Sequence, residues 1–132
     1  MKADSLKKEL AETASAFLTA FDSLDWEQFV SFIANDATFF MPWPTFPNRL
    51  DGIEQIKAAF RPFFTEIPQQ REGPPYLNLR PMDMEIQLFG QAGMVTFHLS
   101  ESDHFSRRTI LFEKRDGKWQ LIHLHASNIY DA

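Results

Sequence analysis

The sequence predicts an α+β fold in which three helices precede a curved, mostly antiparallel sheet. In the first half of the chain, apolar residues recur every three or four positions, which is the period of an amphipathic helix. In the second half, apolar and polar residues alternate, which is the period of a strand with one buried face. Between two of these alternating segments stands Asp116-Gly117, a dipeptide that favours a two-residue hairpin turn. Helices followed by hairpin-linked strands are typical of the α+β class.

The first two helices are predicted from their apolar stripes and from a cap. The spacing predicts an amphipathic helix of about four or five turns from Leu6 to Phe21. A second, short helix is expected to begin near Asp25. Gln28 stands three residues later, and this spacing allows each side chain to bond a free amide of the first turn.

A short strand and a third helix complete the helical half. Residues 37–43 are β-branched and aromatic and run into prolines, so we expect a strand that ends in a loop. The next helix is expected over residues 51–60, with Asp51 as its cap and Glu54 completing the capping box. Pro62 is expected to kink or end this helix.

The second half predicts four strands, over residues 82–89, 94–100, 107–114 and 119–129. The last of them has an unusual pattern. Uninterrupted alternation places Trp119, Leu121, His123, His125 and Ser127 on one face and Ile122, Leu124 and Ala126 on the other.

Neither face of this strand is the polar surface expected of a sheet that is open to water. We expect the imidazoles of His123 and His125 on the hollow side of the sheet. The apolar row of Ile122, Leu124 and Ala126 is then on the back, covered by a second copy in a homodimer through the sheet. The alternative is that these few apolar residues are simply exposed.

Composition narrows the class of protein. The 132 residues suit a single domain, 1–132, and the 14 phenylalanines fill a thick core or line an apolar cavity. There is no cysteine, which excludes disulfides and thiolate sites and agrees with a cytoplasmic location. The net charge of −5 argues against nucleic acid, and we see no long apolar run at the N-terminus for a membrane. We predict no cofactor.

A family resemblance rests on motifs across nearly the whole chain. The C-terminal segment RRTILFEKRDGKWQLIHLHAS resembles the terminal hairpin of SnoaL-like proteins of the nuclear-transport-factor-2-like (cystatin-like) superfamily. It is also similar to the calcium/calmodulin-dependent kinase association domain. Residues 24–40, LDWEQFVSFIANDATFF, resemble the second helix and first strand of the same family.

The resemblance implies a cone, with the three N-terminal helices in the concave face of the sheet and an apolar pocket at the wide end. It implies little about function, because one fold of this kind serves many unrelated roles. In ketosteroid isomerases of this superfamily, a tyrosine and two carboxyl groups perform the chemistry. The corresponding positions here are Phe17, Met41 and one near Thr109, so that activity is not expected.

Three residues are candidates for catalysis in the implied pocket. His125 or His123 can exchange a proton near neutral pH, and Arg108 can hold an anionic oxygen. The alternatives are structural imidazoles bonded to neighbouring strands, or a His-x-His metal pair completed by His98, Glu101, Asp103 or His104. We predict no metal.

The candidate pocket lining is mostly aromatic, and it consists of Phe17, Phe40, Trp43, Phe46, Phe60, Phe64 and His98. These rings either recognise a ligand or plug the cone. We therefore expect a protein that binds a small apolar or aromatic molecule. The alternatives are an isomerase, cyclase or dehydratase that uses a pocket histidine, and a non-catalytic oligomerisation module.

Overall fold

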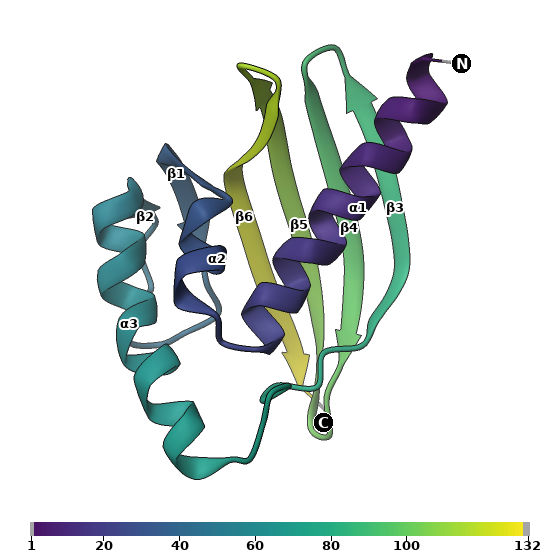
Figure 1. Ribbon diagram of the computed structural model, residues 1–132. Coiled ribbons are helices and arrows are strands. Elements are labelled where there is room, and N and C mark those ends of the chain that lie inside the picture. The colour runs from purple at the N-terminus through teal and green to yellow at the C-terminus, as the bar shows by residue number, and fades with distance from the viewer. Residues whose placement is uncertain (1, 131–132) are drawn as a thin grey trace.

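The computed structural model describes residues 2–130, which form three helices and one six-stranded sheet (Figure 1). The elements are α1 (Lys2–Asp22), α2 (Trp26–Ser31), β1 (Ile33–Phe40), β2 (Leu50–Asp51), α3 (Ile53–Gln70), β3 (Pro81–Phe89), β4 (Ala92–Ser100), β5 (His104–Arg115) and β6 (Lys118–Tyr130). The strand order is β2-β1-β6-β5-β4-β3, antiparallel except where β1 pairs with β6. The predicted α+β class and the curved, mostly antiparallel sheet are confirmed.

The helices follow the predicted stripes, with two corrections at α3. Asp25 caps α2 by accepting a bond from the Gln28 amide. At α3 the cap position is Gly52, without a side-chain bond, so the expected cap at Asp51 is wrong. Pro62 does not end the helix at this point, because α3 continues to Gln70. Buried Phe60 and Phe64 hold the helix on both sides of the proline. No helix within residues 2–130 is long and apolar enough to cross a bilayer.

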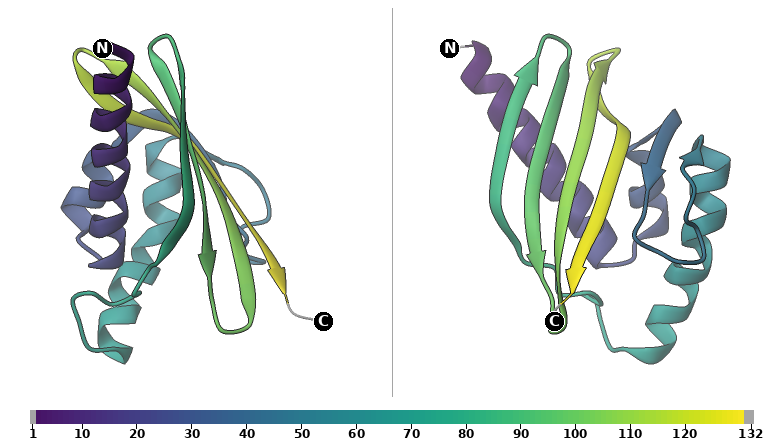
Figure 2. Two further views of the ribbon diagram at one scale, coloured as in Figure 1. Left: turned by 90° about the vertical axis from the view of Figure 1, so that its right-hand side faces the viewer. Right: turned by 180° about the vertical axis from the view of Figure 1, so that it is seen from behind.

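The helices lie on one face of the sheet and leave the other uncovered (Figure 2). α3 packs on β1, and α1 packs on β3 and β4. A Cβ on Gly93 of β4 would overlap the end of the Leu10 side chain of α1, so any larger residue at this crossing would force Leu10 to move. We call the uncovered side the outer face. It carries Thr38 and Phe40 of β1, Met82 and Glu85 of β3, Met94, Thr96 and His98 of β4, Phe105, Arg107, Thr109 and Leu111 of β5, and His123, His125, Ser127 and Ile129 of β6.

The predicted hairpin between β5 and β6 is present, and a bulge follows it. Asp116 and Gly117 form the turn with φ angles of 52° and 76°, as a two-residue hairpin requires. Further along, Phe112 pairs with Leu121 but Leu111 pairs with His123, so Ile122 has no partner. Such an extra residue reverses the faces of everything beyond it.

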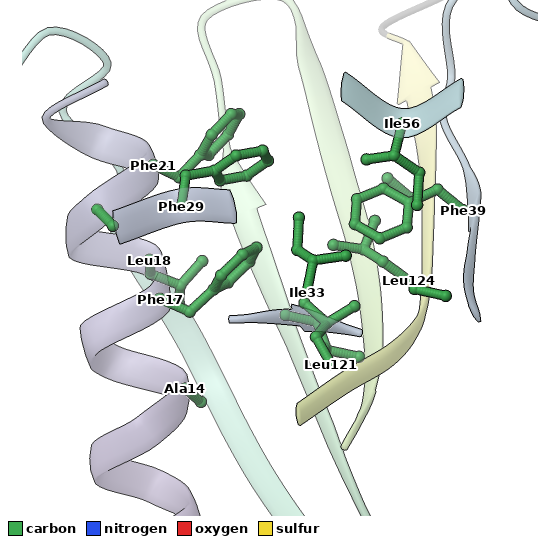
Figure 3. Packing of buried hydrophobic residues seen from close by; sticks show 14 of the residues in the cluster. Ala14, Phe17, Leu18, Phe21, Phe29, Ile33, Phe39, Ile56, Leu121 and Leu124 are labelled. Atoms are coloured by element: carbon green, nitrogen blue, oxygen red, sulfur yellow. The ribbon is translucent and has the colours of Figure 1, made fainter. Parts of the chain in front are cut away.

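The bulge turns Leu124 and Ala126 toward the helices, where they are 5% and 4% exposed. Figure 3 shows Leu121 and Leu124, on either side of the bulge, both pointing into the core. The predicted arrangement of β6 is therefore wrong beyond Leu121. His123 and His125 lie on the outer face, and Leu124 and Ala126 cannot form the back of the sheet.

Candidate functional site

Phenylalanine rings fill the deep part of the cone. Phe29 stacks on Phe17 with ring centres 5.5 Å apart and packs against Phe60 at 5.1 Å and Phe64 at 4.7 Å. The space left among these rings and the sheet is about 10 Å³, which is room for at most one water molecule. A ligand cannot enter the deep cone without displacing the core.

An open cavity of about 420 Å³ lies at the wide end of the cone, and we call it the mouth pocket. The loop after β1, the C-terminal half of α3, the segment before β3 and the ends of β5 and β6 surround it. Its lining residues are Phe21, Met41, Pro42, Trp43, Pro44, Phe63, Arg71, Leu77, Leu79, Glu101, His104, Arg108, Asn128 and Tyr130.

Arg108 is shared by the mouth pocket and the filled core beneath it. Its Nε donates to the hydroxyl of Ser106, which is 1% exposed, at 2.8 Å. The guanidinium forms no ion pair with any carboxylate of residues 2–130. Burial lowers the pKa of Arg108 to about 10, although the charge of Glu101 acts in the opposite direction. The group stays charged at neutral pH, so the floor of the pocket holds a cation without an ion-paired carboxylate from residues 2–130.

The rim of the mouth pocket carries weaker polar groups. His104 bonds Asp103 through Nδ1 at 2.7 Å, and this bond lowers the pKa of Asp103. The His104 ring also lies 5.2 Å from that of Tyr130. Asn128 donates to the Tyr130 hydroxyl at 3.2 Å, while its Oδ1 is buried without a partner among residues 2–130. These groups can orient a ligand, but none of them neutralises Arg108.

The predicted catalytic histidines do not reach this pocket. His123 lies on the outer face, where its Nδ1 is 2.7 Å from the hydroxyl of Thr38. Burial, and secondarily the neighbouring His125, lower the pKa of His123. The Phe40 ring contacts both imidazoles, at 5.9 Å and 5.3 Å. Arg108 is therefore separated from the two histidines by the thickness of the sheet.

The predicted aromatic lining is dispersed over four places. Phe17 and Phe60 line the small space in the core, and Phe64 is buried beside it. Trp43 lines the mouth pocket. Phe46 packs on Trp43 at 6.4 Å but lines a separate groove with the Pro-rich loop and α3.

Two members of the predicted lining, Phe40 and His98, lie on the outer face. His98 is 3.3 Å from a carboxylate oxygen of Asp83 and 4.7 Å from the ring of Phe105. Within residues 2–130, no three His, Cys, Asp or Glu side chains group closely enough to hold a metal ion. Of the positions compared with ketosteroid isomerases, Phe17 and Met41 line the interior, whereas Thr109 faces outward.

Several mouth-pocket residues were not predicted, and the pattern of β6 contains a signal for two of them. Leu124, Ala126, Asn128 and Tyr130 stand at alternate positions, so placing the apolar pair inside also places Asn128 and Tyr130 inside. Arg71, Leu77 and Leu79 come from a segment without regular structure, whose course no sequence period predicts.

A family model matches nearly the whole chain. The model of the calcium/calmodulin dependent protein kinase II association domain matches residues 6–129. Among solved structures, an NTF2-like protein of unknown function from Pseudomonas putida is similar, with a TM-score of 0.80 and 18% identity over 97% of this chain and 89% of that one. No curated protein matches the chain.

Two solved structures carry the same kinase name. The association domain of C. elegans CaMKII has a TM-score of 0.70 and 18% identity, over 94% of this chain and 96% of that one. The S. rosetta CaMKII hub has a TM-score of 0.70 and 21% identity, over 93% and 96%. At these identities, the structural similarity shows a shared fold.

The burial of Arg108 without an ion-paired carboxylate predicts a gain in stability when its charge is removed. Arg108→Met should raise the free energy of unfolding by about 1–3 kcal/mol, because a largely buried cation without an ion-pair partner is replaced by an apolar side chain of similar length. Arg107→Met is the matched control, since Arg107 is exposed on the outer face, and should change it by less than about 0.5 kcal/mol. Urea unfolding at pH 7 measures both. A loss of stability in Arg108→Met would contradict this description of the site.

Proposed function

This chain belongs to the calcium/calmodulin dependent protein kinase II association domain family, and we propose that its mouth pocket binds a small apolar or aromatic molecule that carries one anionic group. The observation that supports the proposal is the largely buried guanidinium of Arg108 at the floor of the pocket, without a carboxylate partner among residues 2–130. A buried charge of this kind is costly unless a counter-charge reaches it.

The walls of the pocket suit the apolar part of such a ligand. Trp43, Phe63 and Tyr130 present aromatic surface, and Leu77 and Leu79 present aliphatic surface. The volume of about 420 Å³ falls in the range of small-molecule sites. A ligand whose carboxylate reaches Arg108 would form charge-assisted hydrogen bonds there while its apolar body covers the rings.

Glu101 limits the charge of the ligand. Its carboxylate also lines the pocket and acts on Arg108 through space without forming an ion pair. A ligand with a second negative group would be repelled by Glu101, so a monoanion fits better than a dianion. Binding is favoured over catalysis, because His104 is the single imidazole of residues 2–130 that lines this pocket, and it is held by Asp103 at the rim.

The charge preference can be tested with a matched pair of probes. The parent protein should bind 1-naphthylacetate at least about tenfold more tightly than 1-naphthylacetamide, because one charge-assisted contact is worth about 1.4 kcal/mol or more. Arg108→Met should bind the two probes equally, and Arg107→Met should behave as the parent. Isothermal titration calorimetry measures the affinities. Retention of the acid preference in Arg108→Met would exclude Arg108 as the anion site.

A second candidate function is self-association through the outer face. No helix covers this face (Figure 2). It presents Met82 and Ile129 at 41% and 50% exposed, together with half-buried Phe40, Met94 and Leu111. An apolar surface across several strands is typical of an interaction site. The name of the family, an association domain, favours a second copy of the chain as the partner.

The charges of the outer face also suit contact with the same face of a second copy. A two-fold dimer places the same patch of each copy against the other. This patch carries negative and positive charges, with Asp83 and Glu85 on β3 and Arg107 on β5. Contact between two copies can therefore pair opposite charges. A homodimer through the back of the sheet thus remains our proposal, but on β6 this face carries His123 and His125 in place of the Leu124 and Ala126 expected from uninterrupted alternation.

A charge at the centre of the outer face should abolish self-association. Leu111 lies between Met94 and His123 on the neighbouring strands, so Leu111→Glu would bury carboxylates in the interface of a dimer. Sedimentation velocity at 10–100 µM, about the range in which weak dimers form, should show a dimer for the parent and a monomer for this variant. Ala16→Glu, on an exposed position of α1, should remain dimeric. A parent that is monomeric throughout would contradict the proposal.

A further inference from the structure

His123 and His125 form a pair of imidazoles on the outer face, and no carboxylate of residues 2–130 stands opposite them on the neighbouring strands. His123 lies next to Thr38 on β1 and Leu111 on β5, and His125 lies next to Phe40 and Thr109. All four neighbours are uncharged. Protonation of either imidazole would therefore place a positive charge among hydroxyl and apolar groups.

Asp36 of β1 and Glu113 of β5, each two residues from a strand neighbour of His123, are both bound by Arg115. On β2, Asp51 is paired with Arg49 at 2.5 Å, and the charge of Arg49 disfavours a proton on His123. On β5, Arg107 bonds Ser127 at 3.3 Å. On β3, at the other edge of the sheet, Asp83 bonds His98, and Glu85 forms no ion pair within residues 2–130.

We propose that the second copy covers His123 and His125 in their neutral form, so that acidification separates the two copies. This inference rests on the self-association proposed above. A two-fold contact brings two imidazole pairs to one interface, and protonation therefore adds up to four positive charges in a region whose carboxylates, Asp36, Asp51 and Glu113, already pair with arginines. The sequence His-x-His on one strand face thus acts as a pH-sensitive element of the interface.

The direction of the effect follows from the burial of the imidazoles. Burial already lowers the pKa of His123 in the single chain, and cover by a second copy would remove more water and lower it further. Free copies then bind more protons than the dimer at acidic pH, and this difference favours dissociation. The dissociation constant of the dimer should rise at least about tenfold between pH 7.5 and pH 5.5.

The test is sedimentation velocity of the full chain at pH 7.5 and pH 5.5, with far-UV circular dichroism to confirm that the protein stays folded. The parent should be dimeric at pH 7.5 and dissociate at pH 5.5. His123→Gln/His125→Gln should remain dimeric at both. His98→Gln is the matched control, because this imidazole faces a carboxylate, and it should dissociate like the parent. The single variant His125→Gln changes an exposed position and is measured in the same way. It leaves the bond between His123 and Thr38 in place.

Each outcome decides a different point. A parent that stays dimeric at pH 5.5, or a double variant that dissociates like the parent, overturns the role of the imidazole pair and leaves self-association intact. A His98→Gln variant that stays dimeric at pH 5.5 assigns the effect to another imidazole and overturns the proposal. A parent that is monomeric at both pH values overturns self-association itself.

Discussion

The single unpaired residue at Ile122 determines the two surfaces of this molecule. Leu121 and Leu124 both point toward the helices, which a regular strand does not permit for residues three apart, and the bulge provides the extra position. Because β6 lies at the centre of the sheet, between β1 and β5, its faces determine what the core and the outer face contain. The leucines complete the phenylalanine core, and the imidazoles are left outside.

The two surfaces have different chemistry, and neighbouring residues illustrate it. Arg107 and Arg108 are adjacent on β5 but project to opposite sides of the sheet. Arg108 enters a mouth pocket in which aromatic walls suit an apolar ligand and its charge suits an anion. Arg107 lies on a broad outer face with both signs of charge and scattered apolar groups, which suits a second copy of the chain. The phenylalanine rings between these surfaces close the deep cone and confine any ligand to its mouth.

Elements with a strong local period were predictable, and features set by one residue were not. The stripe of α1, the Asp25 cap and the Asp116-Gly117 turn each depend on short spacings that the chain displays directly. The bulge at Ile122 has no such spacing, because its extra residue is an ordinary strand former. Alternation alone therefore gave the wrong face for His123 and His125. Arg108 was correctly predicted to lie in the pocket. The segment Arg71–Leu79, which completes the mouth pocket, has no regular spacing of apolar residues from which its course could be predicted.

The accessibility of neighbouring positions on β6 tests the face assignment most directly, and the absence of cysteine from the sequence makes the test simple. Single cysteines at His125→Cys and Ala126→Cys, each in the Leu111→Glu background that prevents self-association, would be reacted with a thiol reagent under native conditions. The structure predicts fast labelling at position 125 and labelling at position 126 that is slower by orders of magnitude, because Ala126 is 4% exposed. Fast labelling at 126 with protection at 125 would mean that β6 has no bulge, and it would place the imidazoles inside the cone.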